Sequence, residues 1–97
     1  MTGMPKLLVA QVLGPYCGTA EDGQYLYDAV QEFIKKGEHI ELDFEGVELA
    51  SSSFFGALIG RLTEEHGPNA FQSLVDYRSL EPRLEFVLTH TLTAIHA

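Results

Sequence analysis

Residues 40–58 have the sequence IELDFEGVELASSSFFGAL, and this stretch decides the fold because it changes from a strand pattern to a helix pattern. Over residues 39–44, apolar and polar residues alternate, which predicts a strand with one buried face, and residues 45–49 form its exit loop. Behind the serines, apolar residues recur at helical spacing at Phe54, Phe55, Leu58, Ile59 and Leu62. We expect a helix here that one of the serines caps and that stops near Gly67-Pro68.

The residues on the N-terminal side of this stretch predict one further strand and one further helix. Leu7 to Leu13 are mostly Leu and Val and end at the breaker Gly14-Pro15, which is typical of a strand. From Thr19, a capping residue followed by acidic residues, apolar residues recur at helical spacing. The helix should stop at Lys35-Lys36-Gly37, since Gly favours the position just after a helix.

The C-terminal side predicts a third strand and a terminal helix. Leu74, Val75 and Tyr77 lie between two turn-like stretches, which favours a strand over residues 73–77. Ser79 is a capping candidate, Pro82 suits the first turn, and the following apolar residues have helical spacing.

The resulting order β-α-β-α-β-α predicts the α/β class, with a small, mostly parallel sheet covered by helices. With 97 residues the chain is near the usual size of one domain, so we expect a single domain over residues 1–97. One core should hold Ile40, Leu42, Phe44, Leu58, Leu62, Val87 and Leu88.

Composition excludes several classes of partner. The formal net charge of -8 would on average repel nucleic acid and anionic membrane surfaces, so we expect neither as a partner. No apolar run has the length of a signal-peptide core or a membrane span. The one cysteine, Cys17, cannot form an internal disulfide, which indicates a reducing compartment and hence the cytoplasm.

Residues 40–58 also resemble the central part of STAS domains, in which a strand ending in an Asp-aromatic or Asp-Leu pair leads through a short loop to Ser-Ser at a helix start. The resemblance is closest to a STAS-like branch of bacterial proteins. It implies a module that binds partner proteins, as in anti-sigma-factor antagonists, with a kinase-like ATPase or a regulatory factor as the partner.

The resemblance also implies a phosphorylation site. In anti-sigma-factor antagonists an Asp-Ser-Ser-Gly motif presents a serine to a kinase, and the phosphate switches partner binding. Aligned by Gly56, the phosphorylated serine falls on Ser52 and the next serine on Ser53. Two positions depart from the motif, because Ser51 stands where the family has Asp and Phe54 stands where it has Gly.

The residues themselves leave two interpretations of the serines open. A serine at the start of a helix commonly caps it, which would give Ser51 or Ser52 a purely structural role. A phosphate at the same place would be tolerated, because the amides and the dipole of the helix start favour negative charge. Of the two adjacent phenylalanines we expect one to be buried and one to lie at the rim as an anchor for a partner. The predicted partner-binding residues are thus Glu48, Ser51, Ser52, Ser53, Phe54 and Phe55.

Other residues carry weaker indications of chemistry. Four histidines, at positions 39, 66, 90 and 96, have no metal-ligand spacing, and we expect no metal and no cofactor. Cys17 is expected to be a small buried residue rather than a nucleophile, and Ser52 lacks the Gly-x-Ser-x-Gly motif of hydrolases. The glycines at 14, 18 and 23 are interpreted as turn residues, and the acidic residues at 41, 43, 45 and 48 as a solvated edge.

These observations favour a non-enzymatic regulatory protein-interaction module, acting as a monomer or weak homodimer. Two alternatives stay open. One is a small ligand- or nucleotide-binding protein, or a minor enzyme, that uses the cleft at the strand ends. The other is a structural subunit that uses the terminal helix as its interface.

Overall fold

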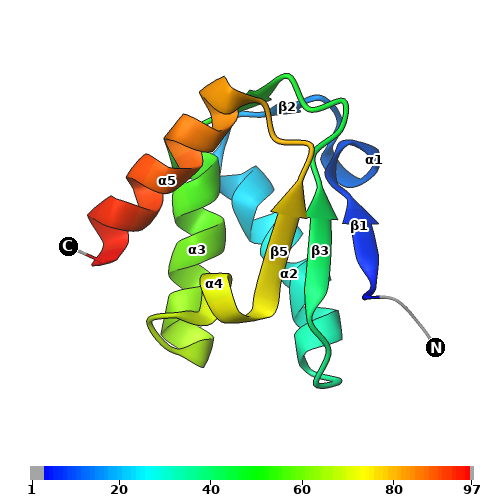
Figure 1. The fold of residues 1–97 in the computed structure, drawn as a ribbon, viewed down its shortest axis with the longest axis vertical. Helices are drawn as coiled ribbons and strands as arrows, with labels where there is room; N and C mark the ends of the chain where they lie inside the picture. The colour runs from blue at the N-terminus through cyan, green and yellow to red at the C-terminus, as the bar shows by residue number, and fades with distance from the viewer. Residues whose placement is uncertain (1–3, 97) are drawn as a thin grey trace.

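The computed structural model describes residues 4–96, the side chain of His96 excepted, and contains a three-stranded parallel sheet. Its strands are β1 (Lys6–Leu8), β3 (Ile40–Asp43) and β5 (Val75–Arg78), in the order β1-β3-β5 (Figure 1). The register places Leu7 beside Leu42 and Leu42 beside Tyr77. The mixed α/β fold and its parallel strands confirm the predicted class.

A second, two-stranded parallel sheet lies beyond the carboxyl ends of these strands (Figure 1). It pairs β2 (Tyr16–Cys17) with β4 (Leu49–Ala50), so that the loop after β1 and the loop after β3 meet. This pairing could not be predicted from the sequence, because strands of two residues are too short to show a periodicity. It positions the serines that follow β4.

One of the two long central helices lies behind the main sheet in Figure 1, and the other packs against it. Helix α2 (Ala20–Ile34) begins where the Thr19 side chain accepts a hydrogen bond from the amide of Asp22, and it ends before Gly37, whose φ is 78°. Helix α3 (Ser52–His66) ends at Gly67, whose φ of 105° suits glycine. The predicted ends of both helices are therefore confirmed, and β3 (Ile40–Asp43) lies within the predicted residues 39–44.

Helix α5 (Pro82–His96) packs on α3 and on β4 rather than on the sheet. Leu84 and Leu88 on its inner face are buried, and Pro82 is its first residue, as the sequence predicted. Ser79 is not its cap, because this residue has a left-handed φ of 61° and the amide of Glu85 bonds to the carbonyl of Glu81. Ser79 instead forms the turn that leaves β5.

The predicted first strand over residues 7–13 is only partly right. The strand ends at Leu8, and Val9–Leu13 form the short helix α1. The reason lies in the sheet, because Leu8 pairs with Asp43, the last residue of β3, and no ladder is available beyond it. Similarly, residues 73 and 74 of the predicted third strand belong to the short helix α4 (Ala70–Leu74).

The core lies between the sheet and the helices. Six of the seven predicted core residues are buried, and Val87 packs against them partly exposed. The prediction that Gly23 is a turn residue is wrong, since Gly23 lies within α2. A Cβ at this position would collide with the carbonyl oxygen of Phe54 and would come within 2.9 Å of the Ala57 Cβ. Helices α2 and α3 therefore touch at this glycine.

Candidate partner-binding groove

The three serines have different environments. Ser51 is the N-cap of α3, where its Oγ accepts a hydrogen bond from the Phe54 amide at 3.1 Å and donates one to the Gly18 carbonyl at 3.0 Å. Ser52 and Ser53 are the first two residues of α3, and both side chains are exposed. The capping interpretation thus holds for Ser51, and Ser52 is left accessible on the surface.

Phe54 and Phe55 are both fully buried, so the prediction that one of them anchors a partner is wrong. Their rings meet edge to face with centroids 5.2 Å apart, and Phe55 also contacts Phe44. Helix α3 packs against α2, α4 and α5, so its buried arc is wide enough to hold two adjacent residues. Of the predicted partner-binding residues, Glu48 and the three serines therefore remain as candidates.

An exposed phenylalanine does lie beside the serines, but it comes from α5. Phe86 is 69% exposed and stacks on His90, with the ring centroids 5.9 Å apart. Together with Leu49, which is 47% exposed, it borders a mostly apolar groove of about 420 Å³ between β4, the start of α3 and α5. The groove is lined by Glu48, Leu49, Ala50, Ser51, Ser52, Arg83, Leu84, Phe86, Val87 and His90. The sequence could not show this, because α5 is separated from β4 by more than thirty residues.

The charged residues of this groove come from both of its sides. Glu48 is exposed on the loop side, and Arg83 lies on the α5 side, where it forms an ion pair of 3.0 Å with Glu81. The amides of Ser52 and Ser53 belong to the first turn of α3, whose N–H groups have no partner within the helix. Ser52 and Arg83 line the same groove.

Two of the acidic residues predicted to form a solvated edge are instead held in ion pairs with side chains of neighbouring strands. Asp43 is buried, forms an ion pair with Lys6 at 3.7 Å and accepts a hydrogen bond from the Glu45 amide at 3.0 Å. The hydrogen bond from this amide is the main reason why the pKa of Asp43 is lowered. Burial raises the pKa, but Ser79, Lys6 and Arg78 lower it further. Glu41 pairs with Arg78 at 3.2 Å. Glu45 and Glu48 are exposed, as predicted.

Cys17 is completely buried in the core, at the end of β2. Burial, reinforced by the negative charge of Asp22, raises the pKa of its thiol to about 11. The thiol is therefore protonated at neutral pH and has little nucleophilic character.

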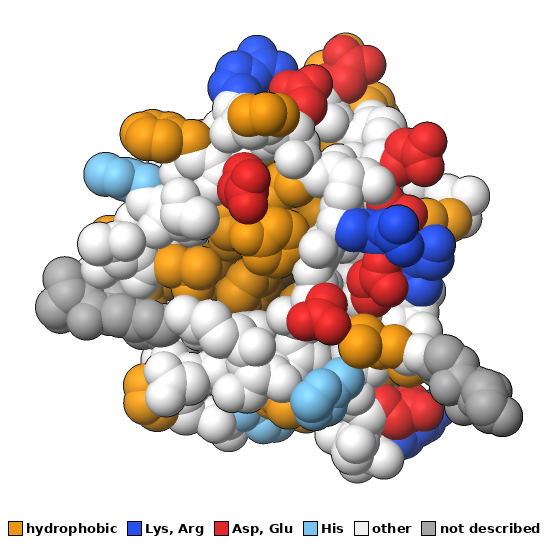
Figure 2. All heavy atoms as spheres, viewed as in Figure 1, with side chains coloured by type: hydrophobic (Ala, Val, Ile, Leu, Met, Phe, Trp, Pro, Cys, Tyr) orange, Lys and Arg blue, Asp and Glu red, His pale blue; other side chains and the backbone are white. Residues whose placement is uncertain are grey.

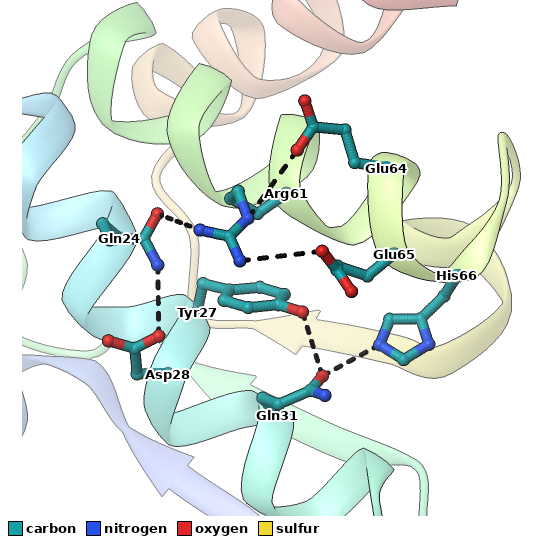
Figure 3. Close-up of polar contacts among 8 residues, drawn as sticks. All are labelled: Gln24, Tyr27, Asp28, Gln31, Arg61, Glu64, Glu65 and His66. Atoms are coloured by element: carbon teal, nitrogen blue, oxygen red, sulfur yellow. Dashed lines mark hydrogen bonds and ion pairs between the residues drawn. The ribbon is translucent and has the colours of Figure 1, made fainter.

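A cluster of polar side chains joins α2 to α3 away from the groove (Figure 3). The Arg61 guanidinium lies 4.9 Å from the centre of the Tyr27 ring, donates to Gln24 at 3.0 Å and pairs with Glu64 and Glu65. Gln31 accepts from Tyr27 and contacts His66 at 2.8 Å. The polar side chains of this cluster are therefore paired with one another, and the cluster holds α2 and α3 together.

In the part of the chain described, no group of three or more His, Cys, Asp and Glu residues could hold a metal ion.

Comparison with known protein families gives one match. The sequence model of a family described as "STAS-like domain of unknown function (DUF4325)" matches residues 22–85. The matched segment contains most of α2 and all of β3, the serines, α3 and β5, but ends just before Phe86. No curated protein and no solved structure matched the chain.

Among residues 4–96, no helix is long and apolar enough to cross a membrane.

Proposed function

Since the chain belongs to the family of STAS-like domains of unknown function, we propose that it is a non-enzymatic regulatory module whose groove between β4 and α5 binds a partner protein. The observation that carries the proposal is Phe86, a large apolar side chain left in solvent at the rim of an apolar groove. Exposed aromatic residues of this kind are common anchors of protein interfaces. Leu49 extends the same apolar surface on the opposite rim.

The proposal includes a switch at Ser52. This serine lines the groove, is exposed, and is not needed as the cap, because Ser51 fulfils that role. A phosphate would bring nearly two negative charges to an apolar contact surface, and a partner would have to desolvate them. Phosphorylation of Ser52 would thus release the partner. Ser53 is exposed but does not line the groove, so it is the weaker candidate.

Two features support a role without catalysis. The Cys17 thiol is buried and protonated, and within residues 4–96 no hydrogen bond joins a serine or cysteine side chain to a histidine. A nucleophile activated by a base would need such a pair. The single cysteine fits the cytoplasm, where a kinase-like ATPase or a regulatory factor would be available as the partner.

The test is affinity capture from a lysate of the source organism with the wild type and matched variants. Phe86→Ala should lose the partner, whereas Tyr25→Ala should retain it, because Tyr25 is similarly exposed on α2 but does not line the groove. Ser52→Asp should keep the thermal midpoint of the wild type and lose the same partner, and Ser53→Asp should bind it. Equal capture by the Phe86 and Tyr25 variants would exclude the groove, and full binding by Ser52→Asp would exclude the switch.

A further inference from the structure

Strand β5 has a free edge. In the described residues it pairs only with β3, and the Arg78 carbonyl accepts a hydrogen bond from the Phe44 amide on that side. Backbone groups of successive residues in a strand point alternately to its two sides, so the N–H and C=O groups of Tyr77 point away from β3. Among residues 4–96 no other strand takes up these groups. Such an edge is a template for an added strand.

A groove with one apolar side runs along this edge. Helix α5 packs on α3 and β4 and so leaves a hollow of about 590 Å³ beside β5. Figure 2 shows this hollow as an apolar surface in the middle of the face, between α5 and β5. Phe71 and Leu92 lie on its helical side, and Phe71 stacks on Tyr77 with the ring centroids 6.3 Å apart. A hydrogen bond of 3.1 Å from Tyr77 to Glu85 joins β5 to α5.

The residues on the other side of the edge are charged. Glu41, Asp76 and Arg78 lie on the open face of the sheet and border the same hollow. Glu41 and Arg78 neutralise each other in an ion pair of 3.2 Å. Asp76 is exposed and has no ion-pair partner among the described residues. The edge therefore combines a groove that is apolar on its helical side with an unpaired negative charge, on a chain whose net charge is -8.

We propose that the free edge of β5 binds an extended segment of a partner protein, in which apolar residues alternate with basic ones. Successive side chains of an added strand point to opposite faces. One set enters the hollow toward Phe71 and Leu92, and the other set lies over the open face near Asp76. The backbone bonds to Tyr77 supply affinity, while the alternation of apolar and basic side chains supplies specificity. A second copy of this chain is the poorer occupant, because it brings another net charge of -8.

The test uses a blocked synthetic peptide that repeats the dipeptide Val-Lys, and it follows amide hydrogen exchange of the protein. We expect the exchange of the Tyr77 amide to slow on binding. A Val-Glu repeat peptide should bind at least about tenfold more weakly, and so should a Val-Lys peptide that is N-methylated at every residue, which has no backbone N–H donor for β5 whether the added strand runs parallel or antiparallel. Asp76→Lys should weaken binding by a similar factor.

Asp28→Lys is the matched control, because Asp28 is an exposed carboxylate on α2, far from the hollow in sequence and absent from its lining. It makes the same change of net charge and should leave binding within about twofold of the wild type. Equal weakening by the two variants would reduce the effect to general attraction and overturn the proposal. Unchanged binding of the N-methylated peptide would also overturn it, as would protection of Tyr77 by self-association without peptide. Phe86→Ala leaves this binding intact, which separates the test from that of the groove beside Ser52.

Discussion

Ser51 and Ser52 are adjacent in sequence but differ in the hydrogen bonds and the exposure of their side chains. The Ser51 hydroxyl makes two hydrogen bonds that tie the start of α3 to the loop before α2, whereas the Ser52 hydroxyl is exposed. We expect Ser51→Ala to lower the free energy of unfolding by about 0.5–2 kcal/mol, the usual cost of a lost N-cap. Ser52→Ala should change it by less than about 0.5 kcal/mol, as surface substitutions do. Urea denaturation followed by circular dichroism measures both.

The reverse order of the two effects would make Ser52 the structural serine and would remove the main argument for its regulatory role. The sequence predicts the role of these serines only in part. The preference of serine for helix starts predicted a cap within residues 51–53, but the choice among them depends on the Gly18 carbonyl. That carbonyl is 33 residues away in the chain. The prediction that Phe54 or Phe55 is exposed is wrong for a related reason, since only the neighbours of α3 determine how wide its buried arc is.

At the scale of elements, the contact between α2 and α3 depends on Gly23. A methyl group there would collide with the backbone of Phe54, and a backbone atom cannot rotate away as the end of a side chain can. We expect Gly23→Ala to lower the free energy of unfolding by about 1–3 kcal/mol, in the range of an overpacked core. The shift of the urea midpoint at constant slope is the measurement.

Gly60→Ala is the matched control for this variant. Gly60 also lies within a long helix, but nothing stands within 4 Å of the position of its Cβ. Because alanine restricts the unfolded chain and favours the helix, this variant should be more stable than the wild type by about 0.5–1 kcal/mol. If both variants were stabilised, the two helices would have to be further apart than the structure places them.

The elements that the sequence predicted correctly are those long enough to show a period. Helices α2, α3 and α5 have fifteen residues each, so several turns repeat the apolar pattern. Strand β3 is short, but its alternation of apolar and polar residues predicts it. Helices α1 and α4 and strands β2 and β4 have five residues or fewer, and their form depends on where the neighbouring strand ends. A local sequence pattern does not show where a neighbouring strand ends.

At the scale of the whole molecule, α5 connects the two proposed binding surfaces. Phe86 and His90 on one side border the groove beside Ser52, and Leu92 borders the hollow beside β5. Both surfaces exist because α5 packs on α3 and β4 and leaves the edge of the sheet free. A displacement of α5 at one surface would therefore alter the other. The two partners would be coupled if either binds one position of α5 more tightly than another.

This coupling requires α5 to be part of the same cooperative unit as the sheet, which also tests the expectation of a single domain. Leu42 of β3 and Leu88 of α5 are both fully buried members of one core cluster. Leu42→Ala and Leu88→Ala should each lower the free energy of unfolding by about 2–5 kcal/mol. Because both residues belong to one core, each variant should shift one and the same transition, whether it is followed by the helical signal or by tyrosine fluorescence. A Leu88→Ala variant in which the helical signal falls first, while the tyrosine signal keeps its wild-type midpoint, would show that α5 unfolds by itself. In that case a ligand at one surface could not act on the other through α5.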